Sequence, residues 1–209
     1  MILKRFLIIF FCLNLVACGG KLTKENINII NTISISEHVV VPDQTMNDNP
    51  GLRIGAAFGG ALGSVIADSL PTNNKDTTAY MKDNNVNVGD IVLNEFKYQI
   101  KQKSSISSKI TDDKNGVSDA TFVLEIQRYG LGAEHDFSSK YRPMIRMSAK
   151  LVKKSGEVIW EENDFVHHME ESILALPLAQ YFTDPKIMVT KYKEVAKLAV
   201  SNILENIAE

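Results

Sequence analysis

The chain has 209 residues, of which 44% are hydrophobic and 23% are charged, and its formal net charge at pH 7 is −2. This composition excludes a disordered chain and a collagen-like repeat. A slightly acidic balance also gives no support for a nucleic-acid partner. We therefore expect a globular protein with one real hydrophobic core.

The first seventeen residues have the organisation of a secretory signal peptide. Lys4 and Arg5 form a short basic region, and an apolar run follows at residues 6–13. This run is shorter than the ~20 apolar residues that a membrane-spanning helix needs. We expect residues 1–17 to be removed from the mature protein.

The apolar run ends in Leu-Val-Ala-Cys at 15–18, and Gly19 follows. This tetrapeptide resembles a bacterial lipobox. The resemblance implies cleavage after Ala17, a diacylglyceryl group on the sulfur of Cys18, and a further acyl chain such as palmitate on its new amino group. Two or more acyl chains anchor a protein stably to a membrane. Glycine rather than aspartate after the cysteine implies sorting to the outer membrane, with the protein facing the periplasm.

Two alternatives to the lipobox remain open. The first is an ordinary secretory signal with a stray cysteine, and the second is an uncleaved membrane anchor. If the lipobox operates, Cys12 leaves with the signal peptide and Cys18 is acylated, so the mature chain keeps no cysteine for a disulfide. The fold must then be held by packing alone.

The segment after the cysteine divides into a tether and a strand. Residues 18–26 are polar apart from Leu22, which indicates a short lipidated tether. In residues 27–36, isoleucines alternate with Asn and Ser, which is the period of a half-buried strand. We expect a single domain over 27–209.

A glycine-rich stretch at 51–70 is the most unusual part of the mature chain. Gly55, Gly59 and Gly63 recur every four residues, so in a helix they share one face and allow another backbone to approach closely. Two interpretations compete. The helix lies against its own domain, or it contacts the membrane or further copies of the chain. A true membrane span is disfavoured, because the uncharged run is too short.

The rest of the chain contains helical and strand patterns. Residues 72–87 are polar and indicate a flexible linker. A helix with one buried stripe is expected at 88–101, a short strand at 107–110, and a second amphipathic helix from Pro185 onward.

Three strands are expected in the last third of the chain, at 121–129, 143–151 and 157–162. The last two form a hairpin around Gly156, and Arg146 and Lys150 lie opposite the apolar face. The predicted fold class is α+β: a mostly antiparallel sheet packed by an internal helix and a C-terminal helix, with a glycine-rich helical insertion.

The sequence LVKKSGEVIWEEN at 151–163 and the stretch GAAFGGALGSVIADSL at 55–70 carry a further resemblance. They resemble small envelope lipoproteins with an anticodon-binding-domain-like α/β domain. This group includes ABC-type transport auxiliary lipoproteins and uncharacterised lipoproteins with a glycine zipper. The resemblance implies a domain that binds another envelope component, and it implies no active-site residues.

No catalytic motif is recognisable. The best metal candidate is the run His167–Glu171, but adjacent histidines point to different sides of a regular element. We therefore expect no enzyme activity, no cofactor and no metal. The leading hypothesis is a periplasmic binding or assembly module, held on the membrane by its lipid, with an envelope protein as partner. The alternative is a membrane-associated homo-oligomer packed through the glycine zipper.

The glycine zipper yields a prediction with a definite sign. Gly59→Leu should lower the free energy of unfolding, because the side chain would force apart two packed backbones. Thermal unfolding measures the effect, and we expect a midpoint that does not change with protein concentration, since only an oligomer shows that dependence. If the variant were stabilised instead, the glycine face would be exposed, because leucine is the better helix former.

Overall fold

The computed structural model describes residues 21–46, 74–112, 117–136 and 138–208. In chain order it contains α2 (Lys24–Asn28), β1 (Ile33–Ile35), α5 (Asn74–Asp83), α6 (Val88–Ile100), α7 (Ser104–Ser107), β2 (Ala120–Ala133), β3 (Lys140–Lys153), β4 (Val158–Val166), β5 (Leu176–Pro177), the short 3₁₀ helix η1 (Leu178–Phe182) and α8 (Pro185–Glu205). The predicted glycine-rich insertion at 51–70 lies outside these residues. The α+β class is confirmed.

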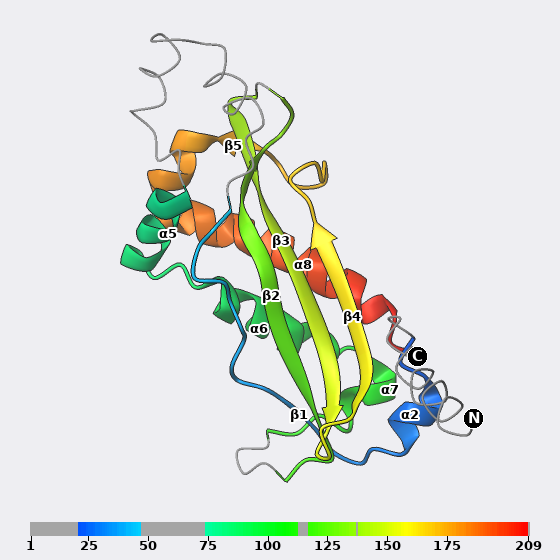
Figure 1. The fold of residues 1–209 in the computed structure, drawn as a ribbon. Coiled ribbons are helices and arrows are strands. Elements are labelled where there is room, and N and C mark those ends of the chain that lie inside the picture. The colour runs from blue at the N-terminus through cyan, green and yellow to red at the C-terminus, as the bar shows by residue number, and fades with distance from the viewer. Residues whose placement is uncertain (1–20, 47–73, 113–116, 137, 209) are drawn as a thin grey trace, which may run out of the picture.

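The sheet has the order β1-β2-β3-β4, and β5 pairs with the start of β3. The long strands β2, β3 and β4 are antiparallel neighbours, as predicted, whereas the short β1 runs parallel to β2. Helices α6 and α8 pack against each other, and α8 also contacts β3 and β4. Both helices lie behind the sheet in Figure 1, so one face of the sheet is covered by helices and the other is not.

A bulge at Gln127 keeps the covered face of β2 apolar along its whole length. The pairing with β3 shifts between Ile126 and Arg128. Before the shift, Phe122, Leu124 and Ile126 are buried. After it, the buried side chains are those of Tyr129 and Leu131. The one extra residue therefore switches the buried positions from even-numbered to odd-numbered residues. The strand has 14 residues and continues beyond the predicted end at 129.

Both long helices begin where the sequence supplies a cap. The Asn87 side chain accepts a hydrogen bond from the Asp90 amide at the start of α6, and Asp184 does the same for Lys186 before α8. Pro185 occupies the first turn of α8, where a missing N–H has no cost. None of the helices in the described ranges is long and apolar enough to cross a membrane.

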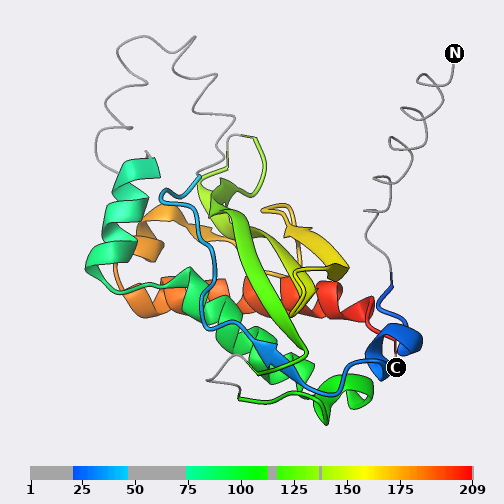
Figure 2. The same ribbon diagram turned by 60° about the horizontal axis from the view of Figure 1, so that its bottom comes forward.

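The N-terminal segment is part of the domain, which differs from the predicted tether over 18–26. The backbone of Leu22 donates to the Asn206 carbonyl at 2.9 Å and accepts from the Ala208 amide at 3.0 Å. Its side chain is fully buried in the core. The segment at Leu22 and the C-terminal segment at Ile207 are thus joined in a short parallel bridge, and the two segments lie together in Figure 2.

The predicted strand over 27–36 is mostly replaced by helix and turn. Thr23 caps α2, and Ile27 and Ile30, three residues apart, are both buried, which is a helical spacing. Only Ile33–Ile35 form a strand. The Lys109 ammonium group donates to the carbonyl oxygens of Ile27 and Ile30, so it satisfies the last carbonyls of this turn.

Two further segments differ from the sequence interpretation. Within the expected linker at 72–87 the structure places helix α5, and Met81 in its last turn and Val86 just after it are buried. In place of a strand at 107–110 it places α7, with only a single bridge from Ile110 to Ile33. In both cases a few buried side chains override a polar local composition.

The single tryptophan yields a stability prediction. The Trp160 side chain is 3% exposed, and its ring lies edge-on to Phe122 with centroids 5.9 Å apart. Trp160→Ala should therefore lower the free energy of unfolding by about 3–5 kcal/mol. Denaturant unfolding of both proteins measures the difference. A change below about 1 kcal/mol would contradict burial of the indole in the core.

The hydrogen bonds that join the segment after α2 to the start of β2 lead to a prediction of how the stability of the protein depends on pH. The Asp119 carboxylate accepts hydrogen bonds from the Asn31 amide at 2.8 Å and the Thr32 amide at 3.1 Å. These bonds, the one from Asn31 first, hold the pKa of Asp119 below its usual value.

Because the pKa of Asp119 is lower in the folded state, the contribution of its carboxylate to stability is present above the unfolded pKa of about 3.9 and is lost as the pH falls through the folded pKa. Asp119→Asn should therefore destabilise the protein at pH 7 and have a smaller effect at pH 3. Urea unfolding at both pH values measures this. Equal effects at the two pH values would contradict the role of the charge.

Candidate functional site

The residues that the sequence singled out as sites, Cys18 and the glycines Gly55, Gly59 and Gly63, all lie outside the described residues, so the structure places none of them. The histidine pair is described. His168 is buried, whereas His167 is partly exposed, and the ring centroids lie 3.8 Å apart. Among the described residues, no group of three or more His, Cys, Asp or Glu side chains is arranged to hold a metal ion.

The face of the sheet that α6 and α8 leave uncovered, here called the open face, carries a row of cationic and aromatic side chains. Arg128, Arg146 and Phe165 come from three neighbouring strands, and the register aligns them side by side. The guanidinium carbons of Arg128 and Arg146 lie 5.8 Å and 5.3 Å from the centre of the Phe165 ring. His167 extends the row, since its ring is edge-on to Phe165 at 5.0 Å.

This row places two positive charges directly across a strand pair, which destabilises a sheet unless something offsets the repulsion. The Phe165 ring offsets part of it through cation–π attraction. No carboxylate of a described residue pairs with Arg146, which is exposed. A planar guanidinium beside an aromatic ring suits the recognition of carboxylate, phosphate or aromatic groups.

A buried arginine holds the chain segment that continues this row. Arg142 on β3 donates to the backbone carbonyls of Ile173 and, at 3.2 Å, of His168. It also forms an ion pair with Glu134 at 2.8 Å. These bonds fix residues 167–173 against the sheet. Arg142 therefore acts as a positioning residue for the histidine end of the row.

A glycine in β2 makes room for the same segment. A Cβ atom at Gly132 would lie 2.3 Å from the ring of His168, which no side chain can tolerate without a shift of that ring. The His168 ring thus rests directly on the β2 backbone. This contact and the Arg142 bonds together explain why His167 projects toward Phe165 instead of into solvent.

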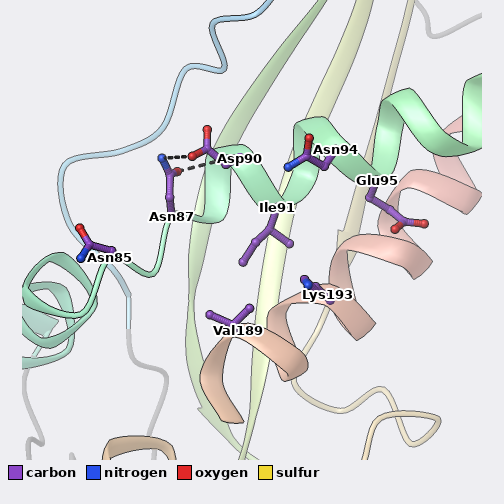
Figure 3. Close-up of a pocket in the computed structure, with 8 residues that line it drawn as sticks. All are labelled: Asn85, Asn87, Asp90, Ile91, Asn94, Glu95, Val189 and Lys193. Carbon is purple, nitrogen blue, oxygen red and sulfur yellow. Dashed lines mark hydrogen bonds between the residues drawn. The ribbon is translucent and has the colours of Figure 1, made fainter. Parts of the chain in front are cut away.

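A groove lies between the start of α6 and the first half of α8, with a volume of about 430 Å³. Ile91 and Val189 contribute its apolar surface, and amide, carboxylate and ammonium groups form the rest, as Figure 3 shows. The lining residues are Asn85, Asn87, Asp90, Ile91, Asn94, Glu95, Val189 and Lys193.

Several polar groups of the groove have structural roles. Asn87 donates to the Asp90 carboxylate at 2.7 Å while capping α6, and the Glu95 carboxylate accepts from Gln99 at 2.7 Å. No nucleophile among the lining residues has a base within hydrogen-bond reach. The groove therefore offers a polar binding surface, and it lacks the paired groups that acid–base chemistry needs.

The sequence placed Arg146 on the polar side of its strand and offered His167 only as a metal candidate, whereas Arg128 and Phe165 were missed. The alternation of apolar and polar residues in β3 indicates that Arg146 faces outward. Which residues of β2 and β4 lie beside it depends on the register of the strands. That register shifts at Gln127 and between Leu151 and Val152. From the sequence, the row could have been anticipated only from arginines at outward positions of neighbouring strands.

No protein-family model matches the chain, and no curated protein matches it. Solved structures resemble it at low sequence identity. A DUF330-family protein from Xanthomonas campestris is 15% identical with a TM-score of 0.35, and the match covers 54% of this chain and 58% of that one. A PelC dodecamer from Paraburkholderia phytofirmans is 11% identical with a TM-score of 0.35, over 91% of this chain and 93% of that one.

A minor lipoprotein from Acinetobacter baumannii is 10% identical with a TM-score of 0.32, over 56% of this chain and 84% of that one. The matched part of the chain thus spans little more than half the length of the first of these proteins. At these identities and TM-scores we carry no function, partner or site residue from them to this chain.

Proposed function

We propose that the chain is a bacterial envelope lipoprotein whose α+β domain binds another envelope component and is not an enzyme. The observation that carries the proposal is the lipobox at 15–18, which would place three acyl chains on Cys18 and hold the protein on the outer membrane, facing the periplasm. The open face supports a binding role, because arginine and aromatic side chains are enriched at protein interfaces.

The lipid anchor is tested by Cys18→Ser. Without acyl chains the protein should be either unprocessed, with residues 1–17 still attached, or soluble after a carbonate wash of membranes, because none of the described helices is long and apolar enough to cross a bilayer. Cys12→Ser is the matched control, since that cysteine lies in the signal peptide, and its fractionation should be unchanged. A Cys18→Ser protein that had lost residues 1–17 and still stayed on washed membranes at native expression level would contradict the lipid as the sole anchor.

The binding role is tested by photo-crosslinking in native membranes. Asn163 is exposed on the open face, two residues before Phe165, whereas Thr190 is exposed on α8. A photo-reactive residue at 163 should give one discrete adduct, which Arg146→Ala should abolish, and a reactive residue at 190 should give none. The role of the open face would be contradicted if the adduct at 163 persisted in the Arg146→Ala protein.

A second candidate function is self-assembly through the glycine zipper, which the four-residue spacing of Gly55, Gly59 and Gly63 favours. Sedimentation of the acylated protein in detergent distinguishes the two candidates. An oligomer that Gly59→Leu dissociates would support self-assembly. A monomer at all concentrations would leave the binding module as the function.

A further inference from the structure

The position of Leu22 limits how far the domain can stand from a lipid on Cys18. Leu22 is fixed by two backbone hydrogen bonds to residues 206–208 and is fully buried. Four Cα-to-Cα steps lead from Cys18 to Leu22, and a fully extended chain covers at most about 3.6 Å per step. The Cα atom of Cys18 therefore lies within ~14 Å of that of Leu22.

The elements around Leu22 form one end of the domain, here called the proximal end. α2 follows Leu22 directly, and Lys109 ties it to the segment after α7. Asp119 ties residues 31 and 32 to the start of β2, and its carbonyl accepts from the Lys154 amide in the β3–β4 turn. In Figures 1 and 2, α2, α7 and the C-terminus lie together at this end.

The proximal end exposes an apolar side chain among lysines. Ile29, the residue after α2, is 65% exposed, although Ile27 and Ile30 beside it are buried. Lys21 and Lys24 precede it and are exposed, as are Lys101 after α6 and Lys154 in the β3–β4 turn. The carboxylates of Glu25 and Glu157 are exposed at the same end. An exposed apolar group with basic neighbours matches the interfacial layer of a membrane, where lipid phosphates attract lysine.

The opposite end carries charges of both signs, since Lys140 and Lys186 are exposed there. It comprises the β2–β3 connection and the residues between β4 and α8, with exposed carboxylates at Asp136, Glu171 and Asp184. β3 joins the two ends, because it begins at Lys140, which pairs with Pro177, and ends at Lys153 beside the proximal turn. Fourteen residues of extended chain separate the ends by about 45 Å.

We infer that the proximal end rests on the membrane that holds Cys18, an inference that depends on the proposed acylation of that cysteine. Ile29 lies at the boundary of headgroups and acyl chains, and the lysines face anionic phospholipid headgroups. β3 then runs away from the bilayer, and Arg146, seven residues before the end of β3, stands roughly 20 Å above the proximal turn. The open face would therefore stand beside the membrane, accessible to a partner from the periplasmic side.

A pair of matched label positions tests this orientation. Ile29 and Leu174 are both exposed and apolar, at 65% and 67%, and they lie at opposite ends of β3, since Ile173 is hydrogen-bonded to Arg142 and Leu176 pairs with Tyr141. In the acylated protein, Ile29→Cys or Leu174→Cys would supply the single free thiol. Each variant is labelled with an environment-sensitive fluorophore and reconstituted in vesicles of phosphatidylethanolamine and phosphatidylglycerol that contain spin-labelled lipid.

We expect the spin-labelled lipid to cause a loss of fluorescence at position 29 and none at position 174. In the same assay, the double substitution Lys21→Glu and Lys24→Glu should reduce the loss at position 29, because it removes the attraction to the headgroups. Thermal unfolding confirms that each labelled protein is folded.

Equal quenching at both positions, or stronger quenching at 174, would overturn the inferred orientation while leaving the anchor intact. Flotation with the vesicles is scored separately. An unsubstituted chain that fails to float would contradict the anchor itself, and with it this inference. The two failures are therefore distinguishable in one experiment.

Discussion

The described domain depends on the short bridge between the segment at Leu22 and the C-terminal segment at Ile207. Leu22 places its side chain in the core and exchanges backbone hydrogen bonds with residues 206 and 208. α2, Lys109 and Asp119 then connect this bridge to α7, β1 and β2. Because the segment after Cys18 is used in the fold within four residues, the domain cannot be suspended on a long linker. A lipid on Cys18 would determine both where the protein is and which end faces the bilayer.

The second constraint is that two helices cover one face of the sheet only. α6 and α8 bury the apolar face, and the bulge at Gln127 keeps that face continuous along β2. Every residue opposite to it then projects outward, which brings Arg128, Arg146 and Phe165 into one row without any motif in the sequence. The cationic–aromatic row is thus a consequence of register, and Arg142 and Gly132 add His167 to its end.

The sequence predicted those elements whose local pattern and tertiary environment agree. α6, α8 and the β3–β4 hairpin show strong periodicity, and their burial follows it. The prediction differed from the structure where a few buried side chains stabilise a segment of polar composition. Leu22 looks like one apolar residue in a polar tether, and α5 has a polar composition, with Met81 buried near its end. The open-face row could be predicted only in part, since Arg146 shows its side of the strand while its partners depend on two shifts of register.

The described domain begins at Leu22, four positions after the cysteine that we propose to be acylated. Native-state hydrogen exchange tests this claim most directly, through the amides of Leu22 and Ala208 in the acylated protein. Both amides donate within the bridge, so we predict that they exchange as slowly as amides of the β2–β3 ladder, at the rate of global unfolding. Exchange of the two amides at the rate of an unstructured peptide, with the ladder still protected, would contradict the account.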